Sequence, residues 1–237
     1  MPAAHRAPDA GARPDGWGAL APVYRWQEPL QRRSVTTLLR VLAPLPGERV
    51  LDVGAGTGLV CRSVPDEVRA VAAVEPSAGM PAAADLDALA AVRADAVRLP
   101  VADGSVDVVV ASWLLHVLDA GDRAAAVAEA ARVLRPGGRL GVVVPAVPRT
   151  TGQRQVRGAA RRLADRRGLG AFRVPVDLPG LLTDAGLQVR HHARTGRGYL
   201  ADVVVCTRAP GPRRPPAVAV SPVSPVGPAA PAPVGRA

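Results

Sequence analysis

The sequence predicts an α/β protein in which a mostly parallel sheet is covered by helices. Short apolar segments that read as buried strands alternate with helical patterns along the middle of the 237-residue chain. Residues 106–112 form a nearly continuous apolar run, which is typical of a parallel strand buried on both faces. A glycine-rich turn at residues 54–58 directly follows the first strand, at residues 50–53. The length suffices for one domain with a sizeable core plus appendages.

The composition is basic and poor in aromatic residues. Arginine supplies all 30 basic residues, and the formal net charge is +10. A basic surface attracts phosphates. However, only six aromatic residues are present, and single-stranded nucleic acid is usually bound by aromatic stacking as well as by charge. A nucleic-acid substrate is therefore less favoured than a small molecule.

The cysteines and apolar segments indicate the compartment. Cys61 and Cys206 are far apart and form no ligand cluster, so we expect buried thiols in a reducing compartment and no metal site. No run of about 18 apolar residues is present, and the N-terminal residues do not form a secretory signal. We expect a cytoplasmic protein without a membrane span. The oligomeric state is not indicated.

Residues 19–208 are expected to form the folded domain. Residues 1–18 and 209–237 are rich in Ala, Pro and Gly, and we expect both to be disordered. Residues 20–43 predict a helix, with Leu30, Leu38, Val41 and Leu42 on one apolar face. Pro44 and Pro46 end this helix before the first strand.

The glycine-rich turn predicts a nucleotide-type site. Glycine permits positive φ and close approach of a ligand to the backbone. The free N–H groups of a helix starting after Gly58, expected over residues 59–64, would point at that ligand. A dinucleotide fingerprint, G-x-G-x-x-G, would place its third glycine at Leu59, whereas here it falls at Gly58. This spacing disfavours an NAD(P)-dependent oxidoreductase.

The segment Asp52-Val53-Gly54-Ala55-Gly56-Thr57-Gly58 instead resembles the D-x-G-x-G-x-G motif of class I S-adenosylmethionine (SAM)-dependent methyltransferases. Three further stretches are similar to this family, in its type 11 or UbiE-like branch: Glu75 to Met80, Asp95 to Pro100, and the phrase R-V-L-R-P-G-G-R-L at residues 132–140. The resemblance covers roughly residues 34–207. It implies a Rossmann-like sheet of seven strands, six parallel and the last antiparallel, sandwiched by helices.

The resemblance also implies a SAM site and its residues. Glu75 ends the second strand, where a carboxylate can accept hydrogen bonds from both ribose hydroxyls. Asp95 and Ala96 would face the adenine, although Ala94 and Val101 replace the family's usual glycine and aromatic residue. The expected cofactor-binding residues are Asp52, Gly54, Ala55, Gly56, Gly58, Glu75, Pro76, Met80, Asp95, Ala96 and Ser112. Ser77 is the expected N-cap of the next helix.

The remaining elements follow the same alternation. We expect strands at residues 69–75, 91–93, 106–112 and 139–144, and a helix from a cap at Asp122 to Leu134. A short helix at 178–185 and two strands at 187–192 and 199–207 complete the domain, with a hairpin turn at 195–198. Met80 either lines the adenine pocket or packs in the core, and Tyr24 and Trp26 of the first helix either touch the ligand or pack.

Residues 148–178 are expected to form an insertion that caps the substrate site. Eight arginines lie between positions 149 and 173. They indicate either a solvated helix or an anion-binding lid.

The implied reaction is methyl transfer to a small-molecule acceptor at an O, N or C atom. The candidate base is His116, just past the fourth strand, with a hydrogen-bonded structural role as the alternative. Residues 111–114 do not contain the N-P-P-Y motif of amino-group methylation. The alternatives are an RNA methyltransferase that uses the arginine-rich segment and a non-catalytic SAM-binding protein.

Overall fold

The computed structural model describes residues 17–68, 70–82, 90–147, 150–152, 154–155, 158, 162, 176–196 and 200–210. The expectations for residues 1–16, for the tail from 211 and for most of the 148–178 insertion lie outside these residues. The sequence also predicts that the helix after Ser77 continues over 85–91, of which residues 85–89 lie outside the described part and residues 90–91 belong to a strand instead. Half of the 195–198 turn, residues 197–198, is likewise outside it.

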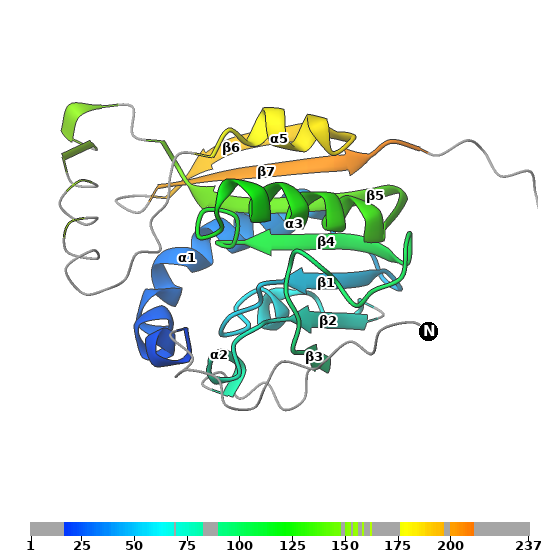
Figure 1. Cartoon of the computed structure of the whole chain (residues 1–237), viewed down its shortest axis with the longest axis horizontal. Helices are drawn as coiled ribbons and strands as arrows, with labels where there is room; N and C mark the ends of the chain where they lie inside the picture. The colour runs from blue at the N-terminus through cyan, green and yellow to red at the C-terminus, as the bar shows by residue number, and fades with distance from the viewer. Residues whose placement is uncertain are drawn as a thin grey trace, which may run out of the picture.

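A seven-stranded sheet forms the centre of the molecule (Figure 1). Its order is β3-β2-β1-β4-β5-β7-β6. The strands are β1 (Arg49–Val53), β2 (Ala70–Val74), β3 (Ala90–Val92), β4 (Val106–Ser112), β5 (Leu134–Pro145), β6 (Leu187–Thr195) and β7 (Ala201–Arg208). The first five pair in parallel, and β7 runs antiparallel to both β5 and β6. The predicted Rossmann-like α/β sheet, with its antiparallel last strand, is confirmed.

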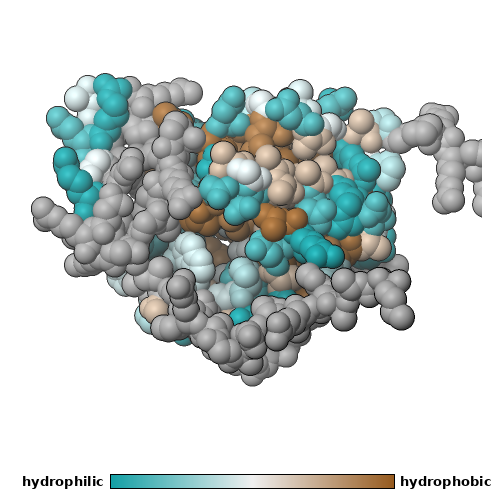
Figure 2. Space-filling view, in the orientation of Figure 1, coloured by the Kyte–Doolittle hydropathy of each residue, from teal (hydrophilic) through white to brown (hydrophobic). Residues whose placement is uncertain are grey.

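Helices cover both faces of this sheet. They are η1 (Gly18–Leu20), α1 (Ala21–Leu42), η2 (Cys61–Ser63), α2 (Gly79–Ala82), α3 (Ala120–Val133) and α5 (Leu178–Asp184). In Figure 1, α3 and α5 lie in front of the sheet and α1 lies behind it. Figure 2 shows apolar residues between hydrophilic ones over α3 and α5, as expected for amphipathic helices that cover a sheet.

The two faces of the sheet build separate cores. Val109 of β4 packs in the cluster that includes Leu182 of α5, whereas its neighbours Val108 and Val110 pack in the cluster that includes Leu38 of α1. This alternation explains the continuous apolar run of β4, because both sets of side chains are buried. Helices therefore pack on both faces of the sheet, which confirms the predicted sandwich.

Arginine side chains hold the amino ends of the strands together. Arg139 Nη2 lies 2.6 Å from Glu48 Oε2, and the Arg49 backbone N–H donates to Asp107 Oδ2 at 2.9 Å. Burial opposes ionisation of Glu48 and Asp107, but hydrogen bonds from their arginine and backbone partners outweigh it and lower the pKa of both carboxyl groups. Some of the arginines therefore form structural ion pairs at the amino ends of the strands, which is the edge of the sheet opposite the carboxyl ends.

Four local predictions need correction. The short helix expected over residues 59–64 is limited to a 3₁₀ helix at Cys61–Ser63, with turns before it. The α3 helix is capped by Asp119, whose side chain accepts from the Asp122 backbone N–H, so Asp122 lies in the first turn. Leu30 is 47% exposed and does not share the buried face of α1. Trp17 and Gly18 belong to the folded domain.

Candidate functional site

The loop after β1 is shaped by its glycines. Gly54, Gly56 and Gly58 all have positive φ, at 69°, 55° and 76°. The Gly54 and Ala55 N–H groups donate to the carbonyl of Val74 at 2.8 and 3.1 Å, which folds the loop across the end of β2. A Cβ at Gly54 would lie 2.8 Å from Leu114 Cδ1. The positive φ favours glycine at this position, and any larger residue would also have to displace the Leu114 side chain.

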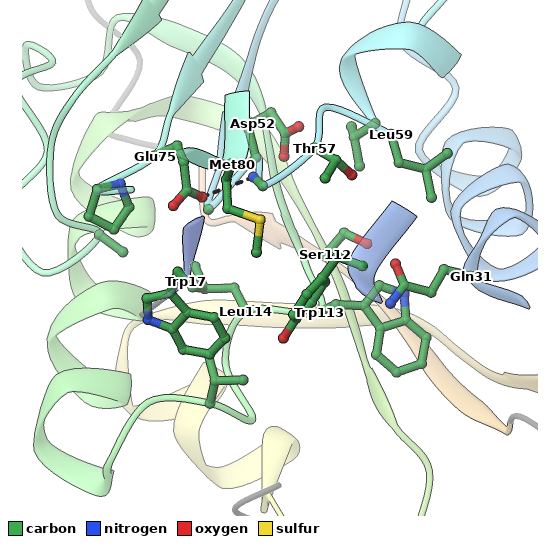
Figure 3. A pocket seen from close by; sticks show the side chains of 18 of the residues that line it. Trp17, Gln31, Asp52, Thr57, Leu59, Glu75, Met80, Ser112, Trp113 and Leu114 are labelled. Atoms are coloured by element: carbon green, nitrogen blue, oxygen red, sulfur yellow. Dashed lines mark hydrogen bonds between the residues drawn. The ribbon is translucent and has the colours of Figure 1, made fainter. Parts of the chain in front are cut away.

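Glu75 joins this loop to the start of α2. Its Oε2 accepts from the Gly56 N–H at 2.9 Å (Figure 3), and its Oε1 accepts from the Ser77 N–H at 2.9 Å. The Ser77 hydroxyl in turn accepts from the Met80 N–H at 3.1 Å, which confirms Ser77 as the helix cap. Backbone N–H groups therefore fix both oxygens of this carboxylate where it lines the cavity.

A cavity of about 210 Å³ lies at the carboxyl ends of β1, β2, β3 and β4. It is lined by every residue expected from the sequence to bind the cofactor except Gly58. Figure 3 shows Asp52, Glu75 and Met80 on one side and Trp17 and Leu114 facing them. Residues from four strand ends and from α1 therefore meet in one site.

Nine further residues line the cavity that the sequence did not predict. They are Trp17, Gln31, Thr57, Leu59, Val60, Trp113, Leu114, Val117 and Leu118. The ring of Trp17 packs edge-on against Tyr24, with centroids 6.1 Å apart. Tyr24 lines the cavity, as one of its two expected uses, whereas Trp26 is 75% exposed and does not line it.

Asp52 is the most deeply buried acid of the site, at 1% exposure. Burial raises the pKa of its carboxyl group to about 7, and the charge of Glu75 contributes in the same direction. The Cys61 thiol opposes this shift, because its Sγ donates to Asp52 Oδ2 at 3.2 Å. Burial together with this carboxylate raises the pKa of the Cys61 thiol, so Cys61 is an inert donor and not a nucleophile.

Two polar positions complete the lining. Asp95 is exposed to the cavity side, and its Oδ1 accepts from the Val97 N–H at 3.2 Å. Ser112, at the end of β4, has a buried Oγ without a hydrogen-bond partner among the described residues. Buried hydroxyls normally have a hydrogen-bond partner, so this one fits a cavity in which a polar ligand supplies that partner.

His116 lies apart from the cavity lining. It is 4% exposed, and its ring packs edge-on against Trp113 with centroids 5.9 Å apart. His116 therefore lies behind Trp113, which itself lines the cavity. Within the described part of the chain, no group of three or more His, Cys, Asp or Glu side chains is arranged to hold a metal ion.

Comparison with known proteins identifies the class. Residues 51–142 match the family model of the methyltransferase domain. The matched region spans less than half of the chain and contains the glycine loop, Glu75 and Asp95, so these residues resemble a methyltransferase domain. The glycine loop, Glu75 and the unsatisfied Ser112 hydroxyl fit the polar nucleoside cofactor that this family uses.

The curated relatives are similar over part of their length. The demethylmenaquinone methyltransferase of Beutenbergia cavernae is 42% identical over 112 residues, which is 46% of this chain and 46% of that protein. An uncharacterised methyltransferase of Mycobacterium tuberculosis is 41% identical over 104 residues, 43% of this chain and 42% of that protein. The similar region therefore spans less than half of each relative.

Solved structures share the fold at low identity. The putative methyltransferase in complex with the Trm112 activator of Haloferax volcanii has a TM-score of 0.65 and 20% identity, and covers 84% of this chain and 100% of that chain. The magnesium protoporphyrin IX methyltransferase of Synechocystis, solved with S-adenosylhomocysteine, has a TM-score of 0.59 and 20% identity, with coverage of 74% and 81%.

Proposed function

We propose that the protein transfers a methyl group from SAM to an apolar small-molecule acceptor. The main support is the convergence of the glycine loop, Glu75 and Asp95 on one cavity. In the proposed complex, Glu75 accepts from the ribose hydroxyls, Asp95 and the Ala96 N–H hold the adenine, and the remaining predicted residues form the cradle. The proposed compartment is the cytoplasm.

The cofactor supplies an electrophilic methyl group on a sulfonium whose leaving thioether is neutral. The protein then contributes mainly alignment and exclusion of water. Leu114, Val117 and Leu118 supply apolar wall to the cavity and suit both roles. A base is needed only if the acceptor must lose a proton early. The burial of His116 favours a structural role, with the base role as the second possibility.

The acceptor class is inferred from the cavity walls and the relatives. Trp17, Trp113 and the three aliphatic residues of the wall favour an apolar or ring-bearing molecule over a phosphorylated one. Several of the similar proteins are named demethylmenaquinone methyltransferases, whose named substrate is a quinone-type ring. We therefore propose a reduced aromatic ring as acceptor. RNA is the second candidate, favoured only by the arginines between 149 and 173.

Transfer of a labelled methyl group from SAM tests this proposal. Reduced naphthoquinone, an aromatic amine and a single-stranded RNA are offered separately. We expect label in the ring compound and a rate about tenfold lower for Trp17→Ala, because an aromatic wall is removed. Trp26→Ala is the matched control and keeps the wild-type rate. Label in RNA alone, lost steeply with salt, contradicts the proposal. So does SAM binding without transfer to any acceptor.

A further inference from the structure

The outward face of α1 combines exposed apolar side chains with arginines. Trp26 is 75% exposed and Leu30 is 47% exposed. They lie four residues apart, so they are neighbours on one side of the helix. Arg33 follows at the next turn of the same side and is also exposed. Exposing a tryptophan and a leucine side by side is costly in water unless they contact something.

The charge on this face has a single sign. The helix carries four arginines, and all of them are exposed: Arg25, Arg32, Arg33 and Arg40. Its one acid, Glu28, is turned toward the glycine loop, where Glu28 Oε1 accepts from the Thr57 hydroxyl at 2.7 Å and from Arg62 Nη2 at 2.9 Å. The outward face therefore carries positive charge around an apolar pair, and no acidic side chain of α1 lies on it.

This pattern fits an anionic lipid surface. A helix lies in the interface when arginines reach the headgroups and tryptophan and leucine enter the boundary with the acyl chains. No helix of the described chain is long and apolar enough to cross a membrane, so the contact would be peripheral. Nucleic acid is less well matched, because Leu30 offers no stacking surface and Trp26 is the one aromatic residue exposed on this face.

We propose that the outward face of α1, defined by Trp26, Leu30, Arg33 and Arg40, is a docking surface for bilayers that contain anionic lipid. The opposite side of the same helix contributes Tyr24 and Gln31 to the cavity. Docking therefore leaves α1 between the bilayer and the cavity, with its lining side turned away from the lipid. The proposal does not depend on methyl transfer, since it concerns a surface outside the cavity.

Co-sedimentation with vesicles tests this surface. The whole protein is mixed with phosphatidylcholine vesicles, with or without phosphatidylglycerol, at low salt. We expect binding only to the anionic vesicles. Trp26→Ser with Leu30→Ser should weaken it about tenfold or more, because the apolar anchor is lost. Arg33→Gln with Arg40→Gln should weaken it and flatten its salt dependence.

The matched control is Leu45→Ser, which removes another exposed leucine, 56% exposed and beyond the end of α1. It should bind vesicles as the wild type does. SAM binding by each variant, measured by calorimetry, checks that the fold is retained. Equal binding to both vesicle types overturns the proposal, as do an equal loss in Leu45→Ser and tighter binding to single-stranded RNA than to anionic vesicles.

Discussion

At the residue scale, the carboxyl group of Asp52 couples the pocket to pH. Burial raises its pKa to about 7, and the Cys61 thiol is the hydrogen-bond donor that limits the shift. An unfolded aspartate titrates near pH ~4. Between these two values the folded protein binds more protons than the unfolded chain. The contribution of Asp52 to the free energy of unfolding therefore falls as pH rises from about 4 to about 7.

Replacing Asp52 by asparagine should remove this dependence. Asp52→Asn cannot ionise, so we expect it to be more stable than the wild type at pH ~8, by about 2 kcal/mol, and to differ little at pH ~4. Urea unfolding at both pH values measures the difference. If the free energy of unfolding differed between Asp52→Asn and the wild type by the same amount at both pH values, the assignment of this pKa to Asp52 would be contradicted.

Cys61 provides a second test of the same group. Cys61→Ala removes the donor that opposes the shift, so the pKa of Asp52 should rise further and the loss of stability should extend to higher pH. Cys61→Ser keeps a donor at this position and is the matched control. The same unfolding series measures both variants, and identical pH profiles for alanine and serine would show that the thiol has no such role.

At the element scale, a polar clamp fixes α1 to the glycine loop. Glu28 of α1 accepts from Thr57 at 2.7 Å and pairs with Arg62 at 2.9 and 3.0 Å, and Arg62 also donates to the Thr57 carbonyl. The Glu28 side chain is 16% exposed, so solvent screens the pair only in part. Because α1 also carries Tyr24 and Gln31, the clamp sets the position of one cavity wall.

Breaking this clamp should loosen the cofactor site more than the fold. For Glu28→Ala we expect the dissociation constant of SAM to rise about tenfold, which corresponds to one charged hydrogen bond. Arg49→Gln is the control, because it breaks an exposed ion pair with Asp107 at the other end of the strands. Calorimetry with SAM compares the variants. Wild-type affinity in Glu28→Ala, or an equal loss in Arg49→Gln, would argue against the clamp.

At the scale of the whole molecule, the parts of the site that can be predicted from the sequence are those that directly follow a strand. The loop at 54–58, Glu75 and Asp95 each follow a buried strand, and parallel strands bring their carboxyl ends together. Trp17 and Val117 could not be predicted, because they reach the cavity only through the packing of distant segments. Aspartate is a good helix cap at either position, so whether Asp119 or Asp122 caps α3 depends on the backbone angles.

The same limit applies to His116 and to the charge. Nothing in the sequence near His116 indicates that its side chain is buried beside Trp113 and does not line the cavity. Arginines at 135 and 139 are committed to Asp107 and Glu48, so net charge alone overstates the surface free for an anion. Only the placement of side chains separates the structural arginines from those on the outward face of α1.

The most direct test of the SAM site is calorimetry with SAM, S-adenosylhomocysteine and NADH on the wild type and on Glu75→Gln. We expect SAM and S-adenosylhomocysteine to bind and NADH not to bind. In Glu75→Gln, we expect binding of both to weaken about 10- to 100-fold, because the ribose hydroxyls lose a charged acceptor. Binding of NADH without SAM, or wild-type affinity for SAM in Glu75→Gln, would contradict the account.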